Sequence, residues 1–183
     1  MNPPFQLRSY LQADLCQAVR LQGGDPTSLS VARLWFGLLS PRFGPVLLCR
    51  LTYWLALKGL KPIARLVSLI NFVAFGVEIA LQADIGPGLF FPHSQGIVIG
   101  SWRIGKNSVI YQGVTLGAKE LDFAYNEHSR PTLGDNVTVG AGAKVLGGVE
   151  IGTGARVGAN AVVVTSIPPN AVAVGVPAKV IDT

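Results

Sequence analysis

An aliphatic residue returns at every sixth position through much of this chain. The clearest series consists of Leu133, Val139, Val145, Ile151, Val157 and Val163, usually followed by glycine. Two earlier series keep the same step, offset by one residue: Ile79, Ile85, Phe91 and Ile97, then Val98, Ile104, Ile110 and Leu116. A period of six fits neither the 3.6-residue turn of an α-helix nor the two-residue alternation of a hairpin strand. It is typical of a parallel β-helix built from hexapeptide repeats.

In such a β-helix each hexad forms a short strand and a corner, and three hexads complete one triangular coil. The repeated aliphatic side chains should point inward and stack on those of the next coil, about 4.8 Å away. Glycine in the second position should relieve a corner that needs positive φ or a close backbone approach. The sequence therefore predicts a mainly β fold.

Composition divides the chain of 183 residues into two parts. Residues 1–77 predict an N-terminal helical region, in which SYLQADLCQAVRLQ is a short helix and the prolines and glycines of 31–75 separate further helices. Residues 78–183 predict the β-helix domain. Within it, residues 117–132 break the repeat and form an excursion loop, and an extended tail closes the C-terminal end.

Residues 31–75 are rich in leucine and aromatic residues and contain no acidic residue. Their cations are Arg33, Arg42, Arg50, Lys58, Lys61 and Arg65. One interpretation is a helical cap on the first coil and on neighbouring subunits; the other is a basic, aromatic surface that lies on anionic lipid. The longest uncharged stretch, Leu66 to Val77, is too short to span a bilayer.

Charge and cysteine content indicate where in the cell the protein is located and which kinds of partner it binds. The net charge of +5 comes without a Lys/Arg block or a nucleic-acid motif, so we expect no nucleic-acid partner. Cys16 and Cys49 are expected to be free thiols, and no secretory signal is visible at the N-terminus. We expect a cytoplasmic protein, peripheral on the inner face of the cell membrane if residues 31–75 bind lipid.

Three segments carry a resemblance to a known family. GVTLGA precedes the excursion loop, VGAGAKVLGGVEIGTGARVGANAVVV follows it, and AVGVPAKVI lies near the C-terminus. Together they resemble the serine O-acetyltransferase-like branch of the hexapeptide acyltransferases over about residues 78–181. The hydrophobic residues 31–77 are similar in style to the polysaccharide-biosynthesis members. The resemblance implies a left-handed β-helix, a homotrimer, and acetyl-CoA as co-substrate in a groove between two subunits, without a metal.

The resemblance also implies two catalytic residues. His93, in FFPHSQG, is expected to act as general base on the acceptor hydroxyl, because an alcohol is a poor nucleophile until its proton is removed. Glu78 stands where the family carries a carboxylate, usually Asp, that orients this histidine. A histidine that only fills a corner and a solvated glutamate are the plainer alternatives.

Acetyl-CoA contacts follow from motif position. The implied residues are Thr115, Gly117 and Ala118 at the start of the loop, Gly140, Ala141, Gly142 and Ala159 along the coils, and Lys179 near the nucleotide phosphates. Small residues leave room for the pantetheine arm, although the packing of the repeat explains each of them equally well.

The acceptor side departs from the serine-specific pattern. Pro92 and Ser101 occupy places where those enzymes carry acidic residues, and Ser129-Arg130 replaces an Arg-His pair. An amino-acid ammonium would then be buried unpaired, which is costly. We therefore expect a sugar or glycan acceptor, contacted by His128, Arg130, Ser101 and Phe91.

The sequence thus predicts an acetyl-CoA-dependent O-acetyltransferase that acts on a sugar hydroxyl in bacterial exopolysaccharide or capsule biosynthesis. The alternatives are a serine O-acetyltransferase of cysteine biosynthesis and a scaffold without catalysis. A γ-type carbonic anhydrase would need three zinc-binding histidines, and the chain has two.

Overall fold

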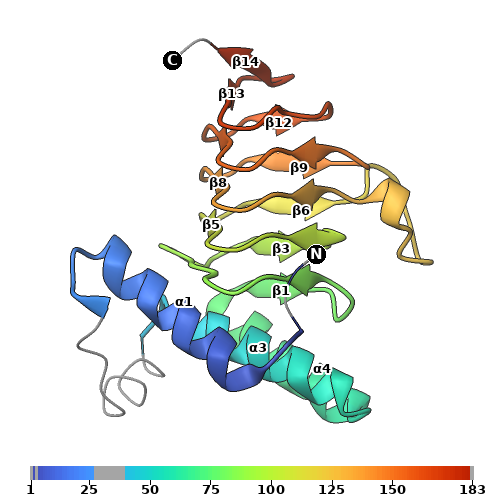
Figure 1. The fold of residues 1–183 in the computed structure, drawn as a ribbon. Coiled ribbons are helices and arrows are strands. Elements are labelled where there is room, and N and C mark those ends of the chain that lie inside the picture. The colour runs from blue at the N-terminus through green and yellow to red at the C-terminus, as the bar shows by residue number, and fades with distance from the viewer. Residues whose placement is uncertain (1, 3, 27–39, 182–183) are drawn as a thin grey trace.

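The computed structural model describes residues 2, 4–26 and 40–181 of the chain. Within these ranges three α-helices come first: α1 (Leu7–Leu21), α3 (Gly44–Leu57) and α4 (Lys61–Phe75). Figure 1 shows them as a layer beneath a stack of strands that rises away from them. Within the described ranges, no helix combines the length and the apolar character that crossing a bilayer requires.

The strands form three sheets, one on each side of a triangular prism. Sheet A contains β1 (Val77–Ile79), β3 (Ile97–Ile99), β6 (Thr115–Gly117), β9 (Lys144–Leu146) and β12 (Val162–Val163). Sheet B contains β2 (Asp84–Ile85), β4 (Arg103–Ile104), β7 (Thr132–Leu133) and β10 (Glu150–Ile151). Sheet C contains β5 (Val109–Ile110), β8 (Thr138–Val139), β11 (Arg156–Val157), β13 (Val172–Val174) and β14 (Lys179–Ile181).

Neighbouring strands in each sheet are one coil apart in sequence. Thr132 pairs with Glu150, and Lys144 pairs with Val162; both steps are 18 residues, or three hexads. The step from Thr115 to Lys144 is 29 residues, because the excursion loop lies between them. The pairs of named strands are parallel except for β14, which pairs antiparallel with β13 at the C-terminal end. The expected fold, a left-handed parallel β-helix preceded by α-helices, is confirmed.

The hexad positions fill the interior as the period predicted. The exposed fraction is 2% or less for every member of the clearest series: Leu133, Val139, Val145, Ile151, Val157 and Val163. The assignment of Val98 to the interior was wrong, because 36% of its surface is exposed. In the three-residue strand β3 side chains alternate, so Ile97 and Ile99 face the core and Val98 faces outward.

Two kinds of glycine shape the corners. The second-position Gly140 permits close approach between coils, since a Cβ there would lie 2.7 Å from the backbone nitrogen of Ala159. Positive φ occurs two residues later, at Gly142 (φ 72), and in the next coil Asn160 adopts the same conformation (φ 56). Asparagine tolerates the left-handed region better than other non-glycine residues. The glycine in the second position is therefore explained by the close approach of neighbouring coils, and not by positive φ.

Local signals set the ends of the helices. Pro45 and Pro62 lie in the first turns of α3 and α4, where a missing N–H costs nothing. Gly76, in the left-handed conformation, ends α4 and lets the chain turn directly into β1.

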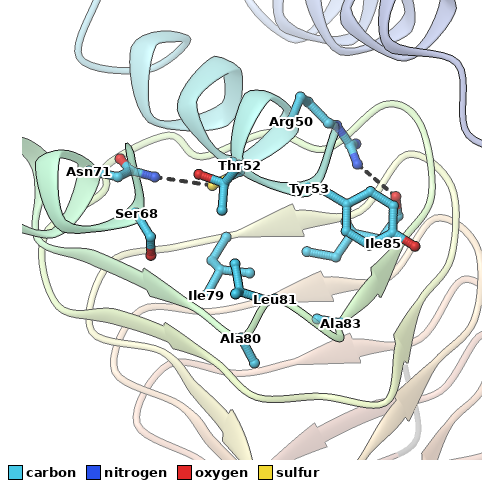
Figure 2. A pocket seen from close by; sticks show the side chains of 11 residues that line it. Arg50, Thr52, Tyr53, Ser68, Asn71, Ile79, Ala80, Leu81, Ala83 and Ile85 are labelled. Carbon is cyan, nitrogen blue, oxygen red and sulfur yellow. Dashed lines mark hydrogen bonds between the residues drawn. The ribbon is translucent and has the colours of Figure 1, made fainter. Parts of the chain in front are cut away.

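A buried ion pair fastens the helical layer to the first coil. Arg50 of α3 donates from Nε and Nη2 to the Asp14 carboxylate of α1, at 2.8 and 2.9 Å. The same guanidinium donates to the carbonyl oxygen of Ile85, as Figure 2 shows, and to that of Gly86. Asp14 also accepts the backbone N–H groups of Gly88 and Leu89. The pair therefore holds two helices and the segment after β2 in one arrangement.

We expect Arg50→Met to lower the free energy of unfolding by about 3–5 kcal/mol, because Asp14 would stay buried without its partner. Urea unfolding followed by circular dichroism measures the change. Arg20→Met, at an exposed position of α1, is the matched control and should change stability by less than about 0.5 kcal/mol. Equal effects of the two substitutions would contradict the role given to this pair.

Candidate functional site

The candidate residues surround the outer face of sheet A. Register pairing places one outward column along this face: Glu78, Val98, Thr115, Lys144 and Val162. One edge of the face adjoins sheet C, and the other edge carries the excursion loop, which Figure 1 shows projecting from the ends of the sheet A strands.

His93 lies at the edge between sheets C and A. It is exposed, in the turn that enters β3. Turns of later coils stack on this turn: the N–H of Gly113 donates to the carbonyl of Gln95, and that of Gly142 to the carbonyl of Gln112. The structure thus brings His93 to the same edge as the acetyl-CoA candidates Gly140, Ala141, Gly142 and Ala159.

Glu78 is exposed on β1, the strand beside β3. Among the described residues no hydrogen bond or ion pair joins Glu78 to His93, so their pairing stays a prediction. Thr115, Gly117 and Ala118 are partly exposed along β6 and just after it. Lys179 is exposed in β14, at the C-terminal end of sheet C.

The excursion loop is held on the opposite edge by Arg130. The Nε of Arg130 donates to the Asp122 carboxylate at 2.9 Å. Its Nη2 donates to the backbone carbonyl of Asp122, and its Nη1 donates to that of Gly100. The guanidinium also lies 3.9 Å from the centre of the Tyr125 ring. Three of its nitrogens are therefore committed to shaping the loop, which leaves few donors for an acceptor molecule.

Tyr125 fixes the loop a second time. Its hydroxyl donates to the carbonyl oxygen of Ser101 at 2.7 Å. Burial raises the pKa of Tyr125 to about 12; the nearby Arg130 opposes the rise and Asp122 adds to it. The phenol therefore stays protonated, and able to donate, well above neutral pH.

The loop runs against the next coil at Gly148. A Cβ there would lie 1.9 Å from the carbonyl oxygen of His128, so only glycine fits beneath the loop. His128 itself is exposed, in the short 3-10 helix η2 (Glu127–Ser129). Between the loop and Gly148 lies an open cleft of about 400 Å³, lined mainly by polar groups that include Lys119 and Asp122.

Not all of the expected acceptor contacts reach the surface. Phe91 and Ser101 have no exposed surface, and the Ser101 hydroxyl has no hydrogen-bond partner within the described residues. The structure places the Phe91 ring in the core of the coil. Of the four residues expected to contact an acceptor, His128 is the one that is exposed.

The role of Asp122 and Tyr125 in holding the loop was missing from the sequence analysis. Their signal was present as charge and aromatic content inside an otherwise apolar repeat. What the sequence did not show is that their partners are Arg130 and backbone carbonyl groups of a different coil.

A second hollow lies in the helical layer and is too small for a cofactor. Its volume is about 20 Å³, enough for one water molecule. Figure 2 shows it between α3, α4 and the segment after β1. Thr52 Oγ1 and Asn71 Oδ1, both among its lining residues, have no hydrogen-bond partner among the described residues.

His93 and the loop do not meet within one chain. His93 precedes β3, whereas Arg130 contacts Gly100, which follows it. The strand between them has three residues, a length of about 10 Å. A reaction centre that uses both edges therefore needs a second copy of the chain or a ligand that crosses the face.

Comparisons with known proteins agree on one family. The model for the bacterial transferase hexapeptide (six repeats) matches residues 130–165. Serine acetyltransferase of Helicobacter pylori strain J99 is 45% identical over 145 residues, which cover 79% of this chain and 83% of that protein. Serine acetyltransferase of Mycobacterium tuberculosis is 45% identical over 133 residues, 72% of this chain but 57% of the relative. The chain thus spans little more than half of that enzyme.

Solved structures of serine acetyltransferases are similar over nearly the whole chain. The Neisseria gonorrhoeae enzyme superposes with a TM-score of 0.82 at 32% identity, covering 97% of this chain and 66% of that one. Its complex with serine gives 0.79 at 33% identity, with 95% and 68% covered. A serine acetyltransferase in complex with CoA gives 0.77 at 34% identity, with 96% and 69% covered.

These relatives contradict the expected sugar acceptor and the assignment to polysaccharide biosynthesis. That prediction rested on Pro92 and Ser101, two uncharged residues at places that are acidic in serine-specific enzymes. The inference failed because an ammonium group can be paired by a carboxylate from another element or another subunit. Two positions are weaker evidence than identity across the whole domain.

We expect Gly148→Ala to loosen the excursion loop, because its methyl group would displace the His128 carbonyl. Backbone amides of residues 119–130 should exchange with deuterium about tenfold faster, the factor that corresponds to about 1.4 kcal/mol of lost local stability. Gly117→Ala is the matched control, since a Cβ there meets no atom within 4 Å. Unchanged exchange in the Gly148 variant would show that the loop is not held as described.

Proposed function

The chain belongs to the serine acetyltransferase family of hexapeptide-repeat proteins, and from this we propose that it transfers the acetyl group of acetyl-CoA to the hydroxyl of L-serine. The observation that carries the proposal is the 45% identity across 83% of the Helicobacter pylori enzyme. The reaction would place the chain in cysteine biosynthesis, the alternative that the sequence left open.

His93 is the proposed general base. In the proposed step its imidazole accepts the proton of the serine hydroxyl while the hydroxyl oxygen forms a bond to the thioester carbonyl carbon. The carbon–sulfur bond then breaks, and the CoA sulfur leaves as the thiol by taking up the proton that His93 received. Exposure of His93 at a turn, clear of the core, suits it to meet a substrate. Glu78 is proposed to orient the imidazole and to stabilise its charged form.

Acetyl-CoA is proposed to lie along the edge between sheets C and A. Support comes from the stacked turns on this edge, where the small residues Gly140–Gly142 lie two coils along from the turn that carries His93. Thr115, Gly117 and Ala118 extend this surface across sheet A, and Lys179 is a cation toward its C-terminal end. The similar structure with bound CoA supports the choice of donor.

A closed homotrimer is proposed as the assembly that completes the site. His93 and the Arg130-held loop lie on opposite edges of sheet A, so a three-fold arrangement sets the loop edge of one subunit beside the His93 edge of the next. The loop then contributes His128 to a groove that no single chain encloses.

The acetylation proposal is tested by thiol release from acetyl-CoA with and without L-serine. We expect serine-dependent turnover on the order of 1–10³ per second. His93→Ala should lower it by about 10² to 10⁴ while CoA binding is retained. His128→Ala reports separately on what the loop contributes to the groove. Wild-type turnover in His93→Ala would contradict the role of His93, and absence of serine-dependent release would contradict the function.

Light scattering tests the trimer separately. At micromolar concentration we expect a particle with three times the chain mass of 19.3 kDa. A monomer with full serine-dependent turnover would show that the site is complete within one chain.

A further inference from the structure

Helix α4 exposes an unusual amount of apolar surface. Its buried residues are Ala64 and Asn71, on the side that faces α3 and the first coil. Six of its large apolar residues are 48–76% exposed: Ile63, Leu66, Leu69, Ile70, Phe72 and Val73. Just before the helix, Leu57 and Leu60 are 59% and 44% exposed. We call these eight residues the α4 apolar face.

The α4 apolar face is a continuous stripe. Ile63, Leu66, Ile70 and Val73 follow one another at steps of three and four, which places them on one side of a helix. That side is turned away from Ala64 and Asn71, so the described part of the chain leaves it open. Figure 1 shows α4 at the base of the β-helix, at the opposite end of the stack from β14.

Positive charge borders this face, and the nearest acidic residue in the sequence is the exposed Glu78, beyond the end of α4. Lys58, Lys61 and Arg65 are all exposed. Residues 40–75 contain no aspartate or glutamate. The remaining cations there are Arg42 and the buried Arg50, which is paired with Asp14.

We propose that the α4 apolar face docks on an anionic phospholipid surface, with the helix lying in the plane of the membrane. Apolar side chains would enter the boundary between headgroups and acyl chains, and the bordering cations would meet lipid phosphates. A second copy of the chain is the competing occupant, but it would bring a face bordered by the same cations and with no acidic residue in 40–75. An anionic lipid surface supplies the negative charge that Lys58, Lys61 and Arg65 lack. The proposal is independent of the acetyl transfer.

Vesicle flotation of the full chain provides the test. Phosphatidylglycerol vesicles should carry the protein at low salt, high salt should release it, and phosphatidylcholine vesicles should carry much less. Replacing Lys58, Lys61 and Arg65 singly by Gln should lower partitioning about fivefold for each residue.

A matched pair of valines isolates the apolar contribution. Val73→Gln changes a side chain that is 76% exposed in the α4 apolar face, and Val176→Gln changes one that is 71% exposed near β14. Both should leave the melting temperature nearly unchanged because both sites are at the surface. The proposal expects flotation to fall severalfold in the first variant and to stay at the wild-type level in the second.

Three results would overturn the proposal. One is equal recovery with both kinds of vesicle, and another is an equal effect of the two valine substitutions. The third is a Val73→Gln variant whose particle mass falls in light scattering while vesicle binding is unchanged. That outcome would assign the face to contacts between copies of this chain.

Discussion

The Asp14–Arg50 pair is the contact through which the helical layer and the β-helix become one structure. Both side chains are almost fully buried, so their charges are tolerable only because each is paired and further hydrogen-bonded. The partners of Arg50 and Asp14 include carbonyl and N–H groups of residues 85–89, in the first coil. Within the described residues no strand lies on the other side of that coil, and these groups supply backbone partners there. The same coil ends in the turn that carries His93, so the ion pair holds the coil to which the candidate base belongs.

Much of the fold could be predicted because the repeat makes the same physical demand many times. An inward position must be aliphatic in each coil, and the period shows which positions these are. The prediction failed at Val98, because its register partners Glu78 and Thr115 belong to the outward column of sheet A. The residues on either side of it, Ile97 and Ile99, face the core instead. The exposure of the eight residues in the α4 apolar face could not be predicted either. Helical spacing predicts an apolar stripe, but whether another element covers that stripe depends on the tertiary structure.

The candidate site was predictable only where a motif recurs. His93 and the small residues at its edge follow from such motifs, and the structure gathers them. The role of Arg130 could not be predicted in this way, because its partners are the Asp122 side chain and two backbone carbonyl groups. Every residue carries a backbone carbonyl group, so a sequence does not show which ones will accept a hydrogen bond. The acceptor was misjudged for a related reason. Specificity depends on which charges meet the ligand in space, and two uncharged residues in a motif do not determine that.

The antiparallel closing strand has a consequence for how the molecule behaves in crowded solution. A stack of parallel strands ends in an open edge, on which a second molecule could add its own coil as a template-directed extension. Here β14 reverses direction against β13, so an incoming coil finds its neighbouring strand running the wrong way. Pro168 and Pro169, beside the last bridge of sheet B, add positions without an N–H to donate. β14 thereby protects this end of sheet C against the addition of another coil.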